Sequence, residues 1–250
     1  MKHTLTFAVI LVGAISHHAT AQSAGGLQNN MQLQRTVERL AGGLSPGEID
    51  YGIPLPPGRT LGDTYLGKGW RKGSITLLDG DKLIEGYFVR YNIELNEFEI
   101  RTPSKVRALD GKKVKNFIWL DSVSQAPSYF VAARDYKDVE GGVFDGFLEV
   151  ISDGPLPLLV KHEVFLRKSD YNVALQVGTR DAIVEKRATI FYAVDGVLYE
   201  VPRSKKKMIQ LMAAHEEAIA KFIKINQVDF GDEDHLAALF DHYNKLSSKL

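Results

Sequence analysis

Three side chains near the middle of the chain are the first candidates for chemistry: His162, Glu149 and Glu163. A histidine beside a carboxylate suits general acid–base catalysis, because imidazole titrates near neutral pH and the carboxylate orients it. His162 shares strand parity with Val160 and Val164, so its ring should face the apolar side of a predicted strand. A hydrogen-bonded core histidine would have the same placement. The alternative is a periplasmic hydrolase or metal-dependent enzyme whose site is assembled only in space.

Two histidines near the C-terminus, His235 and His242, are the candidates for a metal site. They lie seven residues apart in a predicted helix. Two turns separate their Cα atoms by about 10 Å, which is too far for a two-point grip such as His-Glu-x-x-His provides. The acidic residues at 229–234 lack the central glycine and distal glutamate of a calcium loop. The sequence therefore predicts neither a metal nor a cofactor.

Composition removes several other function classes. The chain has no cysteine, which excludes thiol catalysis, cysteine-ligated zinc and iron–sulfur clusters. It has 31 basic and 31 acidic residues, so no global field draws it to nucleic acid. No nucleophile elbow, phosphate loop or dinucleotide fingerprint occurs. Lys205-Lys206-Lys207 fits both a contact with an anionic surface and an ordinary solvated junction.

Residues 1–21 have the pattern of a secretory signal peptide. Lys2 precedes an apolar run from Leu5 to Ile15, and Ala19-Thr20-Ala21 supplies small residues at the cleavage-site spacing, so we expect cleavage before Gln22. The run is shorter than the roughly 20 residues of a membrane-spanning helix, and no second long apolar segment follows. We expect an exported protein, periplasmic or extracellular, with no transmembrane segment in the mature chain.

The elements that must position these side chains fall into three further segments. Residues 22–60 read as a flexible Gly/Pro-rich linker with a short helix at Gln28–Leu40. Residues 61–202 alternate between apolar and polar side chains in short runs, which is typical of strands. Residues 203–250 change to helical spacing, with a bend near Ala213–Ala214 and a new helix capped by Asp232.

Four Asp-Gly dipeptides separate apolar runs in the β segment and indicate tight turns, because both residues reach positive φ readily. They begin at Asp79, Asp110, Asp153 and Asp195. The second should join Val106–Leu109 and Val114–Leu120 into a hairpin. The fold class predicted is α+β: a predominantly antiparallel meander with a C-terminal α-helical pair. Whether the strands form an open barrel, a curved sheet or a sandwich is left open.

Several runs resemble a family of uncharacterised exported proteins of Bacteroidota, which have a β-meander domain followed by a helical segment. The resemblance spans about residues 62–247 and rests on turn and packing residues. The runs are Gly73–Gly80, Ile84–Tyr87, Arg90–Asn92, Asn96–Glu99, Phe222–Asn226, Glu233-Asp234 and His242–Leu246. It implies a compartment, the cell envelope, and carries over no catalytic residue.

With no catalytic constellation evident, we expect a non-catalytic binding or structural module of the cell envelope. Its partner would be another envelope protein or a small ligand. A third hypothesis is an assembly component that adds an edge strand to another protein, because an open meander leaves exposed edges.

Overall fold

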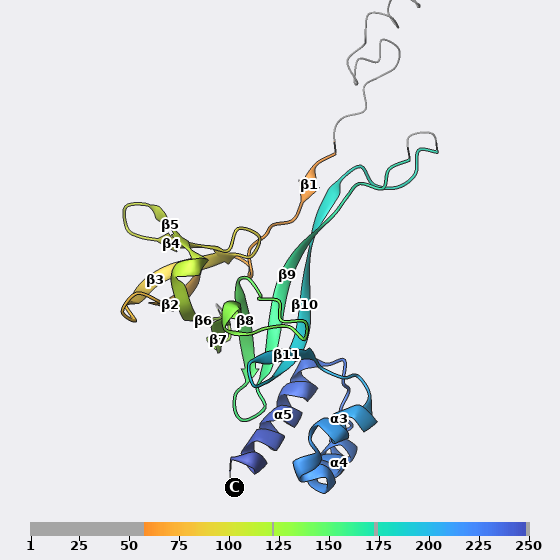
Figure 1. The fold of residues 1–250 in the computed structure, drawn as a ribbon. Helices are drawn as coiled ribbons and strands as arrows, with labels where there is room; N and C mark the ends of the chain where they lie inside the picture. Colours follow the sequence, from red (N-terminus) through yellow and green to blue (C-terminus); the bar gives the residue numbers. More distant parts are fainter. Residues whose placement is uncertain (1–57, 122, 173–174, 249–250) are drawn as a thin grey trace, which may run out of the picture. The chain divides into compact units, whose positions relative to one another are not determined.

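The computed structural model describes residues 58–121, 123–172 and 175–248. This part is α+β, with one large, mostly antiparallel sheet followed by helices (Figure 1). The strands are β1 (Thr60–Leu61), β2 (Arg71–Leu77), β3 (Leu83–Asn92), β4 (Glu97–Arg101), β5 (Val106–Asp110), β6 (Val114–Leu120), β7 (Pro127–Ala132), β8 (Phe147–Ser152), β9 (Leu158–Arg167), β10 (Ala182–Val194) and β11 (Val197–Glu200). The helices are η1 (Gly111–Lys113), η2 (Ala133–Asp135), α3 (Lys205–Leu211), η3 (Ala213–His215), α4 (Glu216–Ile225) and α5 (Glu233–Ser247).

The strands follow the order β1-β10-β9-β8-β7-β6-β2-β3-β4-β5, with β11 paired to β10. All neighbours are antiparallel except β1 and β10. The sheet is open, because β1 and β5 lie at opposite ends of this order. The predicted α+β meander with C-terminal helices is therefore confirmed, and of the three architectures left open the chain forms a single unclosed sheet.

The hairpin predicted across Asp110-Gly111 is wrong. β5 pairs with β4 alone, whereas β6 pairs with β2 and β7. The Asp110 side chain accepts a hydrogen bond from the Lys112 N–H and starts η1 instead of a two-residue turn. The Gly111 N–H meanwhile donates to the Asn96 carbonyl oxygen. The chain thus leaves the edge of the sheet and returns to the far side of β2.

Packing explains why β6 pairs with β2. Phe117 lies opposite Ile75, and both side chains are fully buried. Burying one such aromatic side chain contributes about 2–3 kcal/mol, which an exposed position beside β5 would forfeit. Trp119 lies opposite Gly73, where a Cβ atom would come within 2.9 Å of the Ile118 carbonyl oxygen. Close approach of the two strands therefore requires glycine at 73.

Three buried clusters hold the described part together. The first is aromatic and joins β2, β3, β4, β6, β7 and β8. Within it, Phe117 stacks on Phe130 with ring centroids 4.3 Å apart, and Tyr91 meets Phe147 edge to face at 5.3 Å. The second lies between the helices and β8–β10, and the third joins η2 to β8, β9, β10 and β11. The helices therefore pack on β8–β10, the same strands that contribute to the third cluster.

The bend predicted near Ala213–Ala214 is η3, which separates α3 from α4. Asp232 caps α5, as predicted, by accepting from the His235 N–H. Asn244 then fixes α5 to the β8–β9 turn. Its Oδ1 accepts from the Leu156 N–H at 2.9 Å, and its Nδ2 donates to the Leu156 carbonyl at 3.0 Å.

The predicted signal peptide (1–21) and short helix (Gln28–Leu40) lie outside the described residues, as does nearly all of the predicted linker. Within the described ranges, no helix combines the length and apolarity needed to cross a membrane.

Candidate functional site

The structure brings two of the three predicted acid–base candidates into contact. His162 on β9 and Glu149 on β8 lie on neighbouring strands, and the His162 Nε2 is 2.8 Å from a Glu149 oxygen. Both side chains are mostly buried, with 26% and 21% of their surface exposed. His162 is therefore hydrogen-bonded to a neighbouring strand, the alternative to a catalytic role that its place in the strand left open.

A third carboxyl lies near this pair, at the start of α5. Partial burial raises the pKa of Glu233, the Glu149 charge adds to the rise, and His162 opposes it. A cavity of about 460 Å³ in the described part has His162 in its lining, but neither Glu149 nor Glu233.

Glu163 takes no part in that pair. It neighbours His162 along β9, and successive strand residues point to opposite faces. It nevertheless lines the same polar cavity as His162, together with Lys161.

The two candidate metal ligands have other contacts. The His235 Nδ1 accepts a hydrogen bond from the Asp229 N–H at 3.2 Å, which closes the turn before α5. The His242 ring stacks on Phe222 of α4, with centroids 4.5 Å apart. In the described part of the chain, no group of three or more histidine, aspartate or glutamate side chains is arranged to hold a metal ion. These histidines connect the helices to each other and to their turns.

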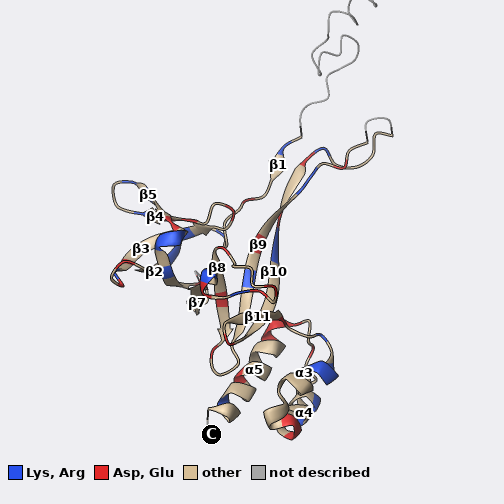
Figure 2. Cartoon of the chain, in the orientation of Figure 1, with Lys and Arg blue, Asp and Glu red and all other residues tan. Residues whose placement is uncertain are grey.

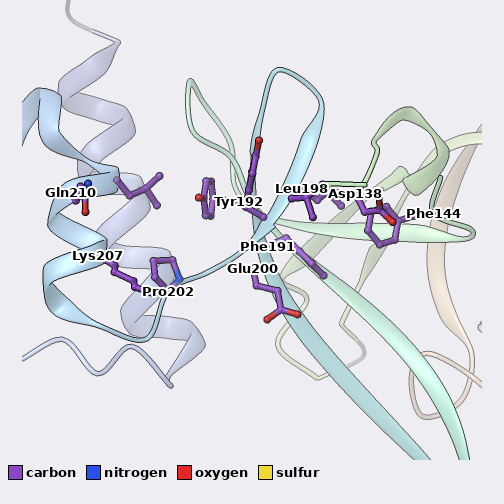
Figure 3. Close-up of a pocket in the computed structure, with 12 residues that line it drawn as sticks. Asp138, Phe144, Phe191, Tyr192, Leu198, Glu200, Pro202, Lys207 and Gln210 are labelled. Carbon is purple, nitrogen blue, oxygen red and sulfur yellow. The ribbon is translucent and has the colours of Figure 1, made fainter. Parts of the chain in front are cut away.

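Sequence reasoning missed an apolar hollow beside the sheet. We call it the α3 groove. Its volume is about 720 Å³, within the range of roughly 300–1,000 Å³ usual for ligand sites. It is lined by Asp138, Val139, Phe144, Phe191, Tyr192, Leu198, Tyr199, Glu200, Pro202, Lys207, Gln210 and Leu211. α3 forms one side, and β10, β11 and the loop after η2 form the rest (Figure 3).

Aromatic side chains make the floor of the α3 groove. Tyr192 and Tyr199 stack across the β10–β11 hairpin, with centroids 5.3 Å apart, and burial raises the pKa of Tyr192. Phe144 meets Phe191 edge to face at 5.9 Å. Such pairs hold each other in place, so a ligand would meet a preformed surface.

The rim of the α3 groove is open and apolar in part. Val139 is 67% exposed and Tyr199 is 37% exposed. Exposed apolar side chains at one hollow suggest an interaction surface. Figure 3 shows Lys207 and Gln210 on the α3 side and Asp138 on the opposite side. The polar groups therefore sit at the margins, where they could orient a partner.

β11 also contributes backbone groups to this region. The Leu198 N–H donates outward to the Lys137 carbonyl oxygen, while the Val201 N–H donates inward to Ile190. Because antiparallel pairing alternates, the backbone groups of Glu200 face the same outer edge as those of Leu198. Lys137 pairs with β11 only near Leu198, so an extended segment of a partner could form backbone hydrogen bonds with Glu200.

No signal in the sequence would have located the α3 groove. Phe144 and Tyr199 come from segments far apart in the chain, and each reads locally as an ordinary strand or turn residue. Lys205-Lys206-Lys207 was the only local feature of the sequence to indicate that this region contacts something charged.

Comparison with known proteins finds no matching family, curated protein or solved structure.

Proposed function

We propose that this chain is an exported cell-envelope protein that acts as a non-catalytic binding module. Its α3 groove would hold an extended protein segment that combines bulky apolar side chains with acidic residues. The observation that carries the proposal is the groove itself, a preformed aromatic hollow with exposed apolar side chains at its rim.

The charge on the α3 side of the groove supports a partner with acidic residues there, whereas Asp138 and Glu200 make the rest of the lining acidic. Lys207 lines the groove, and Lys205 and Lys206 line a second hollow along α3 that shares Gln210 with the first. Figure 2 shows this cluster of basic residues at the start of α3. The three lysines form no ion pair within the described residues. A partner carboxylate there would meet unpaired positive charge and would set the direction in which the segment lies.

Backbone geometry supports an extended partner. The outward groups of Glu200 offer one pairing point, and alternate side chains of a paired strand would then project toward the aromatic floor. A small apolar ligand would use the floor alone and would gain nothing from the lysines or the strand edge.

The test is a selection from a random peptide display library on the full mature chain. We expect the enriched peptides to combine aromatic or aliphatic residues with aspartate or glutamate. Lys207→Glu should weaken their binding by about threefold or more, as expected for loss and reversal of a rim charge. The matched control is Lys168→Glu, an exposed lysine outside the groove lining. Equal effects of the two changes, or enrichment of basic peptides, would overturn the proposal.

A further inference from the structure

A second cavity, which shares no residue with the α3 groove, surrounds the buried amine of Lys161. We call it the Lys161 cavity. Its volume is about 460 Å³. It forms where the end of β3 and the start of β8 meet the middle of β9, with Leu66 from the β1–β2 connection also in its lining. Its polar lining comes from Glu94, Asn96, Lys112, Asp145, His162 and Glu163 in addition to Lys161.

Lys161 is only 9% exposed, which is rare for a lysine. Its Nζ donates one hydrogen bond, to the Asp145 backbone carbonyl at 2.7 Å. An ammonium group has three N–H donors, so two remain. Burial lowers the pKa of Lys161, while the charges of Glu163 and Asp145 act in the opposite direction.

The positive and negative side chains that line this cavity form no ion pair with each other. Among the described residues, no carboxylate lies within 4.0 Å of the Lys161 Nζ, and the carboxylates of Asp145 and Glu163 form no hydrogen bond or ion pair. Tyr91 closes the inner end, where its hydroxyl donates to the Asn96 side chain at 3.0 Å. A ligand inside would therefore meet free donors and free acceptors together.

Gly146 keeps the inner end open. A Cβ atom at this position would lie 2.9 Å from the Tyr91 hydroxyl and 3.9 Å from the Lys161 Nζ. The φ of Gly146 is +79°, which favours glycine. The tyrosine hydroxyl and the lysine amine thus approach one point from two strands.

The charge balance selects the kind of ligand. Glu94, Asp145 and Glu163 oppose Lys112 and Lys161, so the lining has a formal charge of −1 (two positive groups against three negative). This balance disfavours a free anion. A hydroxyl group can accept from the lysine and donate to a carboxylate with the same oxygen, and it can be buried without desolvating a charge.

We propose that the Lys161 cavity binds a small neutral sugar, with its hydroxyl groups bridging Lys161 to Asp145 and Glu163. The sugar completes the hydrogen bonding of the buried amine. The site is independent of the α3 groove, so either can fail without the other.

The test is saturation-transfer NMR on the full mature chain. The probes are D-glucose, D-galactose, D-mannose and N-acetyl-D-glucosamine at millimolar concentration, with glycine and acetate as charged comparators. At least one sugar should receive saturation, and Lys161→Met should weaken its binding about tenfold or more, the effect of losing a hydrogen bond to a charged group. Lys168→Met, an exposed lysine outside the cavity, should bind normally.

Glu163→Gln provides a second variant, should Lys161→Met fail to fold. It keeps the side-chain shape but removes the charge, and it should also weaken sugar binding. Binding should decline as the pH rises through the pKa of Lys161, because the neutral amine offers fewer donors. The proposal is overturned if no sugar in the panel binds, if glycine or acetate binds in preference, or if the cavity variants bind as well as wild type.

Discussion

Replacing Asn244 with alanine should loosen the attachment of the helices to the sheet. Asn244 is 4% exposed, and its amide meets the backbone N–H and carbonyl of Leu156, itself a buried residue. The same amide also reaches the Ser152 hydroxyl and the Asp153 carbonyl, each at 3.2 Å. Alanine would leave both Leu156 backbone groups without a partner and away from water.

The loss of stability can be worked out from the Leu156 N–H and carbonyl groups that lose their partner. Each buried group left unpaired costs about 1–3 kcal/mol, so Asn244→Ala should lower the free energy of unfolding by about 3 kcal/mol. With a urea m-value of about 2 kcal/mol/M, the midpoint should fall by about 1.5 M. Gly154→Ala should act on the same contact, because its Cβ would lie 2.7 Å from the Asn244 Cγ.

The assay is equilibrium urea unfolding followed by circular dichroism. Lys245→Ala, an exposed position on the same helix, is the control and should change stability by no more than about 0.5 kcal/mol. If Asn244→Ala shifts the midpoint no more than Lys245→Ala does, the reasoning about this contact is wrong. Packing in the second buried cluster, which joins α3, α4 and α5, would then be what holds α3 beside the groove.

Three further predictions concern other parts of the molecule. Arg90→Lys should lower stability by about 1–2 kcal/mol in urea unfolding, because the guanidinium both pairs with Glu99 and stacks over Tyr65, which an ammonium cannot reproduce. The pH dependence of unfolding should differ between wild type and Lys161→Met. Burial lowers the folded-state pKa of Lys161 below 10.5, so the unfolded chain binds that proton more tightly. The stability of wild type relative to Lys161→Met should therefore rise as the pH increases from the lowered pKa toward 10.5. If the chain is exported as proposed, mass spectrometry of the envelope fraction should find a mature N-terminus at Gln22, and an intact Met1 there would contradict this.

Sequence patterns were sufficient for most of the strands. The bounds predicted for Val114–Leu120 coincide with β6, and those predicted for Val106–Leu109 differ from β5 by one residue, because each run ends at turn residues. Strand neighbours were harder to predict. Asp110-Gly111 looks locally like the other Asp-Gly turns, and only the burial of Phe117 against β2 decides that β6 pairs elsewhere.

The candidate sites, like the strand neighbours, could be predicted only in part from the sequence. His162 and Glu149 could be linked in advance because they lie on either side of the predicted Asp153-Gly154 turn. Lys161 read as one more polar residue of a strand, and its burial follows from the way β3 and β8 meet over it. The α3 groove depends on where α3 docks, which no local pattern encodes.

The most direct test of the proposed binding function compares two tyrosines of equal exposure. Tyr199 in the α3 groove is 37% exposed, and Tyr87 on β3, outside the groove, is 38% exposed. The measurement is the dissociation constant of the best selected peptide for Tyr199→Ser and Tyr87→Ser. We predict a loss of about tenfold or more for Tyr199→Ser, the cost of one aromatic anchor, and no change for Tyr87→Ser. Equal affinities for the two variants would contradict binding in the α3 groove.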